Sequence, residues 1–255
     1  MSLVFTPIED IPLINKGDDI SNIILKALDF NKINLENGDI LIVTQKIVSK
    51  SEGRLVNLND ISVSEKANKI ALISDKDPRL IELIIRESKE ILRVTKKHLI
   101  VEHKLGFICA NAGIDHSNVF SNNGNPEDFY LLLPSDPDES AKRINKDIYK
   151  QSRKKIGILI IDSHGRAWRN GILGTVIGLS NVPGLVDLRG KEDLFGYKLR
   201  ISQEAVADEL AASASLLMGQ ADEKVPVVHV RGFPHPLRKS SLKELIRPKK
   251  FDLFR

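Results

Sequence analysis

The most apolar run of the chain, residues 156–161 (IGILII), is followed at once by the polar sequence DSHGR at 162–166. Such a run predicts a buried strand of the core. A carboxylate at the end of a buried strand, here Asp162, is held rigidly and can still reach a ligand. Gly165 would allow a sharp turn or close approach to a phosphate, and Arg166 offers donors that match phosphate oxygens. The alternative is that Asp162 only caps a turn.

Hydrophobic periodicity and capping signals divide the rest of the chain into mixed elements. Asp136, Pro137 and Glu139 have the spacing of a capping box at a helix start. Strands and helices do not alternate strictly, which favours an α+β fold with mixed sheets over a doubly wound sheet. The expected helices are 18–29, 62–74, 77–93, 137–151 and 202–218, the last capped by Ser202; the expected strands are 39–44, 98–102, 105–110, 131–133, 156–161, 172–179 and 225–230.

The basic charge of the chain belongs to one terminal segment. Residues 238–255 hold seven Lys and Arg against two acids, a net charge of +5, whereas the whole chain is +4, so everything before them sums to −1. A nucleic-acid-binding protein is expected to have a basic face and aromatic side chains for stacking, and aromatic residues are only 5% here. We therefore expect no nucleic-acid partner.

The pattern also bears on location and thiol chemistry. No stretch approaches the roughly 18 uninterrupted apolar residues of a membrane helix, and the first residues lack the pattern of a secretory signal. We expect a cytoplasmic protein with no membrane partner. The single cysteine, Cys109, lies in an apolar run, which predicts an inert buried thiol.

Two further polar segments follow apolar runs. In the first, Asp115 and Asn118 offer the hard oxygen ligands that Mg²⁺ or Mn²⁺ prefers, although Asn, Gly and Asp are also ordinary loop residues. In the second, Lys46, Lys50 and Arg54 could neutralise phosphate charge, or could form a solvated basic turn. No GxxxxGK[ST] run is present, so a P-loop is excluded.

Taken together, these motifs resemble the coenzyme F-420 gamma-glutamyl ligases. The resemblance spans residues 3–232 and leaves the tail from about 233 outside it. It is carried by the segments 38–54, 108–119, 131–141, 160–180, 187–196, 207–220 and 226–232.

The resemblance implies an activity and an assembly. Members of that family attach L-glutamate to a deazaflavin precursor, with GTP as co-substrate, Mg²⁺ or Mn²⁺, and a monovalent cation such as K⁺. The implied fold is a two-part α+β protomer in an intertwined homodimer. The expected regions are a ligase region 1–232, divided into 1–95 with 198–232 and 96–197, and a basic C-terminal tail 233–255.

Residues matching the family motifs define the expected site. Asp115, Asp162 and Arg166 are the candidate catalytic residues. Asp115 and Asp162 match the ligands of one metal, and Ser163 and Gln220 match positions at a second metal, although an acid stands in place of Gln220 in at least one member. The positions that match nucleotide contacts are Ile11, Pro12, Leu13, Ile14, Gln45, Lys46, Lys50, Asn118, Gly219, Gln220 and Ala221.

Joining an amine to a carboxylate in water requires an activated carboxylate, which GTP can supply as an acyl phosphate. Phosphoryl transfer asks the protein mainly for positioning and charge neutralisation, and the residues above suit that task. Three alternatives stay open at this point: a related ligase that glutamylates another carboxylate, a metal-dependent phosphohydrolase or nucleotide-binding protein that uses the same aspartates, and a scaffold whose basic tail binds an acidic partner.

Overall fold

The buried runs meet in one five-stranded sheet with the strand order β1-β12-β2-β8-β9. The computed structural model describes residues 2–119 and 125–253. β2 and β8 are parallel and the other neighbours are antiparallel, so the sheet is mixed, as expected for the α+β class. The strands are β1 (Val4–Pro7), β12 (Val227–Arg231), β2 (Ile40–Thr44), β8 (Gly157–Arg166) and β9 (Arg169–Ser180).

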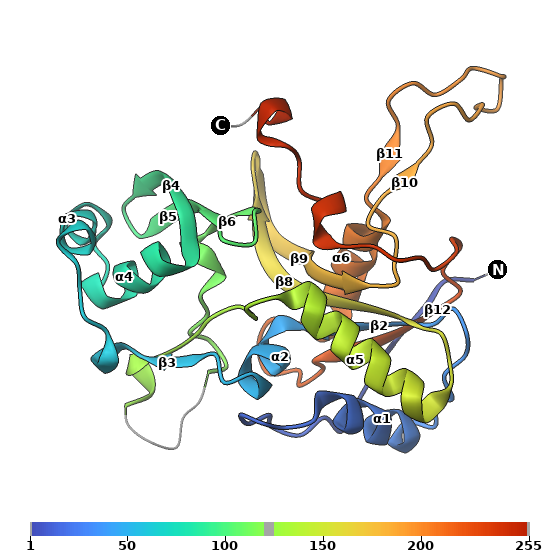
Figure 1. Cartoon of the computed structure of the whole chain (residues 1–255), viewed down its shortest axis with the longest axis horizontal. Helices are drawn as coiled ribbons and strands as arrows, with labels where there is room; N and C mark the ends of the chain where they lie inside the picture. The colour runs from blue at the N-terminus through green and yellow to red at the C-terminus, as the bar shows by residue number, and fades with distance from the viewer. Residues whose placement is uncertain (1, 120–124, 254–255) are drawn as a thin grey trace.

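Helices cover both faces of this sheet (Figure 1). One face, with Ile158 and Ile160, packs against α1 (Ile20–Phe30) and α5 (Pro137–Ser152). The other face, with Leu159 and Ile161, packs against α6 (Val206–Met218). Because successive side chains of a strand point to opposite faces, a sheet covered on both sides requires the continuous apolar run seen at 156–161.

A second, smaller sheet lies beside the first and is covered by its own helices (Figure 1). We call it the small-sheet unit. Its apolar core combines residues of all of its helices and strands. It contains α3 (Glu65–Ser74), α4 (Pro78–Glu87), β4 (Ser88–Thr95), β5 (His98–His103) and β6 (Ile108–Ala110).

The remaining elements are short. β3 pairs with β7 and β10 with β11. α2 follows β2 directly and lies against the same face as α1. These elements are α2 (Gln45–Ser51), β3 (Leu55–Asn57), β7 (Phe129–Leu131), β10 (Val186–Asp187), β11 (Gln203–Glu204) and the 3₁₀ turns η1 (Leu58–Asp60), η2 (Asn111–Gly113), η3 (Pro126–Asp128), η4 (Leu242–Glu244) and η5 (Lys249–Phe251).

Several element boundaries differ from the sequence prediction. The helix expected over 77–93 ends at Glu87, because residues 88–95 pair with β5 as β4. The helix expected from Ser202 begins at Val206. The strand expected at 131–133 spans residues 129–131. α2 and β1 were not predicted, whereas the cap at Asp136 is confirmed, since its carboxylate accepts from the Glu139 amide at 3.0 Å.

The basic C-terminal segment packs on the fold. Leu242 is buried, and its amide donates to the Asp138 carboxylate at 2.9 Å. Further along, Lys249 forms an ion pair of 2.9 Å with Glu90 of β4. The segment therefore connects the five-stranded sheet to the small-sheet unit. Among the described residues, none of the helices combines the length and apolar character needed to cross a membrane.

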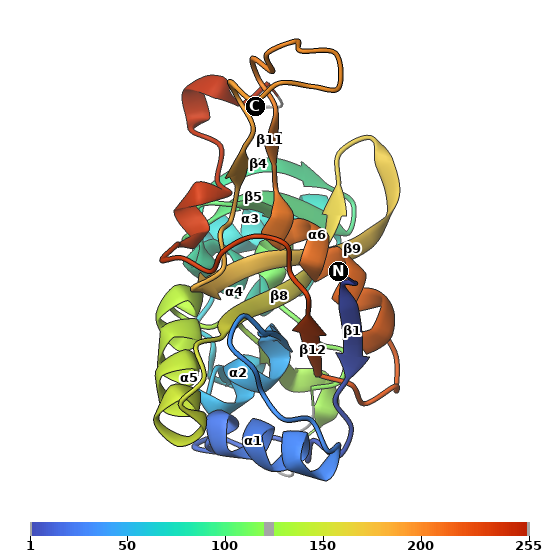
Figure 2. The same cartoon turned by 90° about the vertical axis from the view of Figure 1, so that its right-hand side faces the viewer.

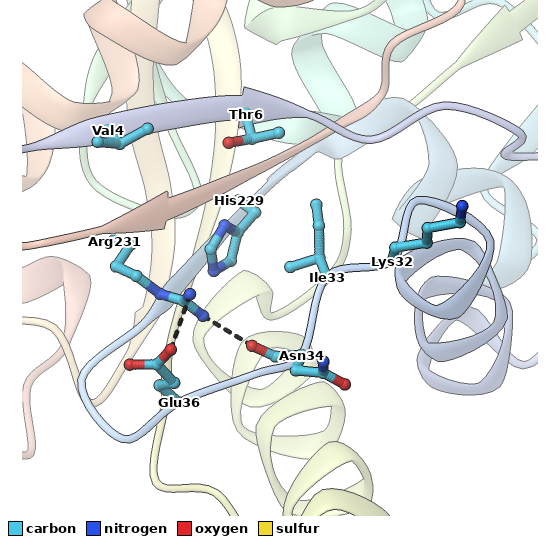
Figure 3. A pocket seen from close by; sticks show the side chains of 8 residues that line it. All are labelled: Val4, Thr6, Lys32, Ile33, Asn34, Glu36, His229 and Arg231. Carbon is cyan, nitrogen blue, oxygen red and sulfur yellow. Dashed lines mark hydrogen bonds and ion pairs between the residues drawn. The ribbon is translucent and has the colours of Figure 1, made fainter.

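A buried ionic network closes the start of β2. The Asp39 carboxylate accepts two hydrogen bonds from Arg231, at 2.9 and 2.8 Å, and its Oδ2 lies 2.9 Å from Nε2 of His229. Arg231 also pairs with Glu36 at 2.9 Å. Figure 3 shows His229 and Arg231 lining a cavity of about 360 Å³ between β1, β12 and residues 32–36.

The predicted division into residues 1–95 with 198–232 and 96–197 remains a prediction. The five-stranded sheet takes strands from both of these parts, since β2 pairs with β8 along its whole length.

Candidate active site

The DSHGR segment continues β8 beyond its buried part. The expectation that Asp162 and Gly165 begin a loop is wrong, because β8 runs to Arg166 and the chain turns only at residues 167–168, where Trp168 has the positive φ. A register shift between Ile160 and Ile161 marks a β-bulge just before Asp162. The extra residue is Ile177 of β9, so β8 itself keeps its regular alternation. Bulges of this kind are frequent next to active sites.

From Asp162 onward, successive side chains of β8 point to opposite faces of the sheet. Ile160 lies in the core shared with α1 and α5, so Asp162 and His164 follow on that side. Ile161 lies in the core shared with α6, so Ser163 follows on the other side. The contacts agree with this division. His164 Nε2 lies 3.0 Å from Asp162 Oδ2, and the Ser163 hydroxyl donates to Gln220, just beyond α6, at 3.1 Å.

Asp115 reaches the same place from the turn η2. Asn111, Ala112 and Gly113 all have φ between 50° and 62°, which bends the chain sharply. Asp115 then pairs with Leu131 through two backbone hydrogen bonds of 2.9 and 2.8 Å. Gly113 is required by packing as well, because a Cβ there would lie 2.8 Å from Leu133 and 3.4 Å from Asp162 Oδ2.

The two carboxylates influence each other electrostatically. Burial and then the negative charge of Asp162 raise the pKa of Asp115, and Lys46 and Gln45 partly oppose the rise. The Gln45 amide donates to Asp115 Oδ2 at 2.6 Å, and Lys46 Nζ lies 3.5 Å from the same oxygen. The mutual repulsion of two carboxylates in a partly buried site would be relieved by a cation that both of them bind.

The lysines come from α2 and project toward the loop after Asp115. Lys46 and Lys50 are four residues apart, so they lie on one face of the helix. Lys46 Nζ donates to the Ser117 carbonyl at 2.9 Å and hydroxyl at 3.0 Å. Lys50 Nζ donates to the Asn118 carbonyl at 2.8 Å. Burial lowers the pKa of Lys50, and the charge of Lys46 adds to that effect.

The turn after α6 completes the site. The Asn118 side-chain amide donates to the Ala221 carbonyl at 2.9 Å, which joins segments 103 residues apart. Together with the contact between Ser163 and Gln220, this bond places the 219–221 turn beside both predicted acidic segments. Hydrogen bonds or electrostatic coupling thus join most of the predicted site residues, namely Gln45, Lys46, Lys50, Asp115, Asn118, Asp162, Ser163, Gln220 and Ala221.

Two groups of predicted site residues, Arg166 and the 11–14 segment, are not among the residues joined by these hydrogen bonds. Arg166 is exposed at the tip of the β8–β9 hairpin and donates to the Asn170 carbonyl at 3.4 Å. In the 11–14 segment, Ile14 is buried in the core beside α1 and α2, whereas Leu13 is 84% exposed. The segment continues to Gly17, whose amide donates to the Ser51 carbonyl at the end of α2.

Residue patterns alone did not assign Ser117 or His164 a role. His164 had a readable signal, because a residue two positions beyond Asp162 on a strand lies on the same face. Ser117 had none, since its contact with Lys46 depends on how two distant segments meet. Cys109 behaves as expected: it is buried, and burial, followed by the charge of Asp162, raises its pKa to about 12.

The donor set suits a hard cation that shares its ligands with a substrate. No group of three or more His, Cys, Asp and Glu side chains is placed to hold a metal ion within residues 2–119 and 125–253. A cation at Asp115 and Asp162 would therefore complete its coordination with neutral oxygens and with oxygens of a bound molecule. This is the manner in which Mg²⁺ is usually held beside phosphates.

An acidic pair and a lysine pair meet at one end of a mixed sheet, and together they define an α+β protein with a charged candidate site. The F420-0:Gamma-glutamyl ligase family model matches residues 9–232, and the chain belongs to this family. It is 41% identical to the coenzyme F420:L-glutamate ligase of Methanothermobacter thermautotrophicus over 100% of both chains. It is 39% identical to that of Methanocaldococcus jannaschii, over 96% of this chain and 94% of the relative, and 38% identical to that of Archaeoglobus fulgidus, over 98% and 95%.

Proposed function

We propose that the protein is a GTP- and divalent-metal-dependent ligase that joins L-glutamate to the carboxylate of a deazaflavin coenzyme precursor. Family membership supports the ligase reaction. The observation that carries the nucleotide and metal part is the convergence of Asp115, Asp162 and the α2 lysines with the 219–221 turn. This arrangement offers both a cation site and positive charge for phosphate.

The reaction follows from the need to activate a carboxylate. An oxygen of the precursor carboxylate bonds to the γ-phosphorus of GTP, the bond from that phosphorus to the β-phosphate oxygen breaks, and GDP leaves. The glutamate nitrogen then bonds to the acyl carbon, inorganic phosphate leaves, and the nitrogen loses a proton. Each step demands orientation and charge neutralisation more than a protein nucleophile.

Asp115 and Asp162 would hold Mg²⁺ or Mn²⁺, and Ser163 with Gln220 would contribute to a second cation position. When bound, such a cation neutralises charge on the phosphate oxygens. K⁺ belongs to the same proposal as an assisting monovalent cation. It is tested by replacing K⁺ with a large organic cation at constant ionic strength.

The nucleotide would lie along α2. Lys46 and Lys50 would neutralise phosphate charge, and Asn118 with the 219–221 turn would hold the rest of the molecule. Lys46 and Lys50 now donate to backbone carbonyls of the 117–118 loop, and a bound phosphate would compete for these donors. The 11–14 segment, which leads to the end of α2, belongs to the same proposal.

The proposal includes a homodimer. The β10–β11 arm, residues 186–204, extends away from the rest of the chain in both views (Figures 1 and 2). Near its tip Leu194 is 96% and Phe195 95% exposed. Large apolar side chains on a projecting arm are costly in water and are typical of protein–protein contacts. Sedimentation of the purified protein should give twice the mass of the chain, and a monomer would contradict this part.

Purified protein supplied with GTP, Mg²⁺ or Mn²⁺, L-glutamate and the deazaflavin precursor should yield a glutamylated product and equimolar GDP. Mass spectrometry of the product and chromatography of the nucleotides measure both. Loss of GTP without an amide product would indicate a phosphohydrolase. An amide formed with another carboxylate, but not with the precursor, would indicate a different acceptor.

The acidic pair is tested by Asp162→Asn, which retains the size of the side chain and removes its charge. We expect turnover to fall at least 100-fold while the fold is retained. Asp147→Asn, a change at a helix surface position where the carboxylate pairs with Lys150, is the matched control and should retain full activity. Normal turnover by Asp162→Asn would contradict the metal assignment.

A further inference from the structure

The ring of His164 lies within hydrogen-bond distance of the Asp162 carboxylate. Both residues lie on one face of β8, two positions apart, and Nε2 of His164 lies 3.0 Å from Oδ2 of Asp162. The two side chains are only 11% and 9% exposed. A carboxylate held through one oxygen by a neighbour on the same strand has little freedom to rotate, because the strand fixes the positions of both Cα atoms.

The ring of His164 is in turn held by the small-sheet unit. Phe107, in the turn between β5 and β6, lies with its ring centroid 5.2 Å from that of His164. On its other side Phe107 stacks on His103, at 5.1 Å and an interplanar angle of 5°. Three rings thus connect β5 to the acidic strand β8.

Phe107 is well placed for this task because it contacts all three large apolar cores. The turn that carries it is closed by backbone hydrogen bonds, with the His103 amide donating to the Phe107 carbonyl at 2.9 Å. The Leu105 amide donates to Nδ1 of His103 at 3.0 Å. The C-terminal segment supports the same turn, since a Cβ at Gly106 would lie 3.1 Å from Ile246.

We infer that His164 is a positioning residue that holds the Asp162 carboxylate in the orientation required for cation binding, and that Phe107 holds the ring of His164. The inference rests on the proposed function, because it assigns the cation to Asp115 and Asp162. Partners that orient metal-binding carboxylates typically change metal affinity 10- to 100-fold when removed. The small-sheet unit therefore orients a ligand of the cation through the ring of Phe107. Neither Phe107 nor His103 is itself a ligand.

A pair of substitutions separates the hydrogen bond from the ring. His164→Phe retains a ring against Phe107 and loses the N–H, whereas His164→Gln retains an N–H donor at a similar reach and loses the ring. His98→Phe, at an exposed position of β5, is the matched control. Phe107→Leu removes the stack and leaves His164 itself unchanged.

The measurement is Mn²⁺ binding in the presence of GDP, followed by electron paramagnetic resonance of the free ion, together with thermal unfolding. We expect His164→Phe to weaken Mn²⁺ binding about tenfold or more with little change in Tm, and His164→Gln to remain within about threefold of the unaltered protein. Phe107→Leu should weaken binding less, and should add nothing when His164→Phe is already present, because both changes act through one bond. If His164→Phe fails to fold, the Phe107→Leu and His164→Gln results decide.

Three results would overturn the inference or its foundation. Unchanged Mn²⁺ affinity in His164→Phe would overturn the positioning role alone. Nitrogen hyperfine coupling to bound Mn²⁺ that disappears in His164→Phe would make His164 a ligand instead. Absence of Mn²⁺ binding by the unaltered protein with GDP would overturn the metal part of the proposed function, and the role of His164 with it.

Discussion

Asn111, Ala112 and Gly113 adopt the left-handed conformation one after another, immediately before the acidic residue of their loop. At Gly113 both the backbone and the space are restrictive, since a Cβ would lie 2.8 Å from Leu133 Cδ1. The Asp162 carboxylate lies on the same side, with its Oδ2 3.4 Å from such a Cβ.

Gly113→Ala should lower the free energy of unfolding by about 2 to 4 kcal/mol, from left-handed strain of about 1 to 2 kcal/mol and from the contact with Leu133. Urea denaturation measures the change. Gly17→Ala is the control, because Gly17 also has a positive φ but nothing lies within 4 Å of a Cβ there. The control should show the strain alone, and equal losses at the two positions would contradict the packing role of Gly113.

Asp39 links stability to pH. Burial alone raises its pKa, but hydrogen bonds from Arg231 and His229 outweigh burial and hold the pKa of Asp39 well below its ordinary value. A carboxyl with a lowered folded-state pKa stabilises the fold fully above its unfolded pKa of about 4. That stabilisation is lost as the pH falls below this value.

Asp39→Asn should therefore be less stable at pH 7 by about 2 kcal/mol, since it removes the buried negative charge that accepts hydrogen bonds from the half-buried Arg231. It should also lose less stability than the unaltered protein between pH 5 and pH 3. Urea denaturation at each pH gives both values. A parallel decline of the two proteins on acidification would show that Asp39 does not carry this dependence.

Composition and position alone could locate Asp115 and Asp162, because a polar residue directly after an apolar run is a local signal. They could not show the bond between Asp162 and His164, or that Gly165 lies within a strand. Those depend on the pairing of β8 with β9, which continues past Asp162 to Arg166. The same pairing carries Arg166 to the exposed tip of the hairpin.

At the scale of elements, β9 shows how one extra residue changes helix packing. The bulge opposite Ile160 and Ile161 adds Ile177 to β9. Gly174 and Gly178 are an even number of residues apart, yet Gly174 faces α6 and Gly178 faces α5. Without the bulge both would face the same helix, so the bulge lets a single strand admit a close helix on each side.

Gly178→Ala should lower the free energy of unfolding by about 3 kcal/mol, because the new methyl group would overlap the backbone of Pro137 at the start of α5 and overpacking of this kind costs about 1 to 3 kcal/mol or more. Thermal unfolding measures the loss. Gly165→Ala, in the neighbouring strand, has nothing within 4 Å of its Cβ and no positive φ, and should leave Tm unchanged. Equal Tm values for the two variants would contradict the proposed close approach of α5.

Elements whose signals are local were predicted well, and those decided by tertiary pairing were not. The start of α5 was predictable because Asp136 caps it through a nearby amide. The end of α4 was not, because residues 88–95 lack a glycine or proline and become a strand only through β5. β1 is four residues long and contains a proline, which gives it almost no signal of its own.

For the molecule as a whole, the C-terminal segment holds two parts of the fold together. Its contacts include the buried Leu242, the hydrogen bonds to Asp138 and the ion pair between Lys249 and Glu90. Arg238 and Glu244 add an ion pair of 2.7 Å within the segment. The basic tail, which lies outside the family resemblance, thus packs on the fold through these contacts.

Removing residues 238–255 should lower Tm by at least about 5 °C, since losing one buried leucine side chain and its neighbouring hydrogen bonds costs about 2 to 4 kcal/mol. Differential scanning calorimetry measures the change. Leu253→Ser, at a position that is 83% exposed, is the control and should leave Tm nearly unchanged. An unaltered Tm after the longer deletion would contradict a structural role for the segment.

The site brings together residues from distant parts of the sequence, near positions 45, 115, 162 and 220. Sequence patterns could mark each segment separately, and family resemblance could name the residues. Neither could show that Asn118 contacts Ala221 or that Lys46 contacts Ser117, because such contacts depend on how the helices pack on the sheet.

The insertion of β12 between β1 and β2 has a consequence for synthesis on the ribosome. β1 is made before β12, which ends at Arg231 and is its only sheet neighbour among the described residues. Until Arg231 has left the exit tunnel, β1 has no partner in the sheet and one edge of β2 stays open. The nascent chain therefore carries an unpaired, aggregation-prone edge until β12 has been made, and the polar turn 219–221 reaches the acidic pair only at about the same time.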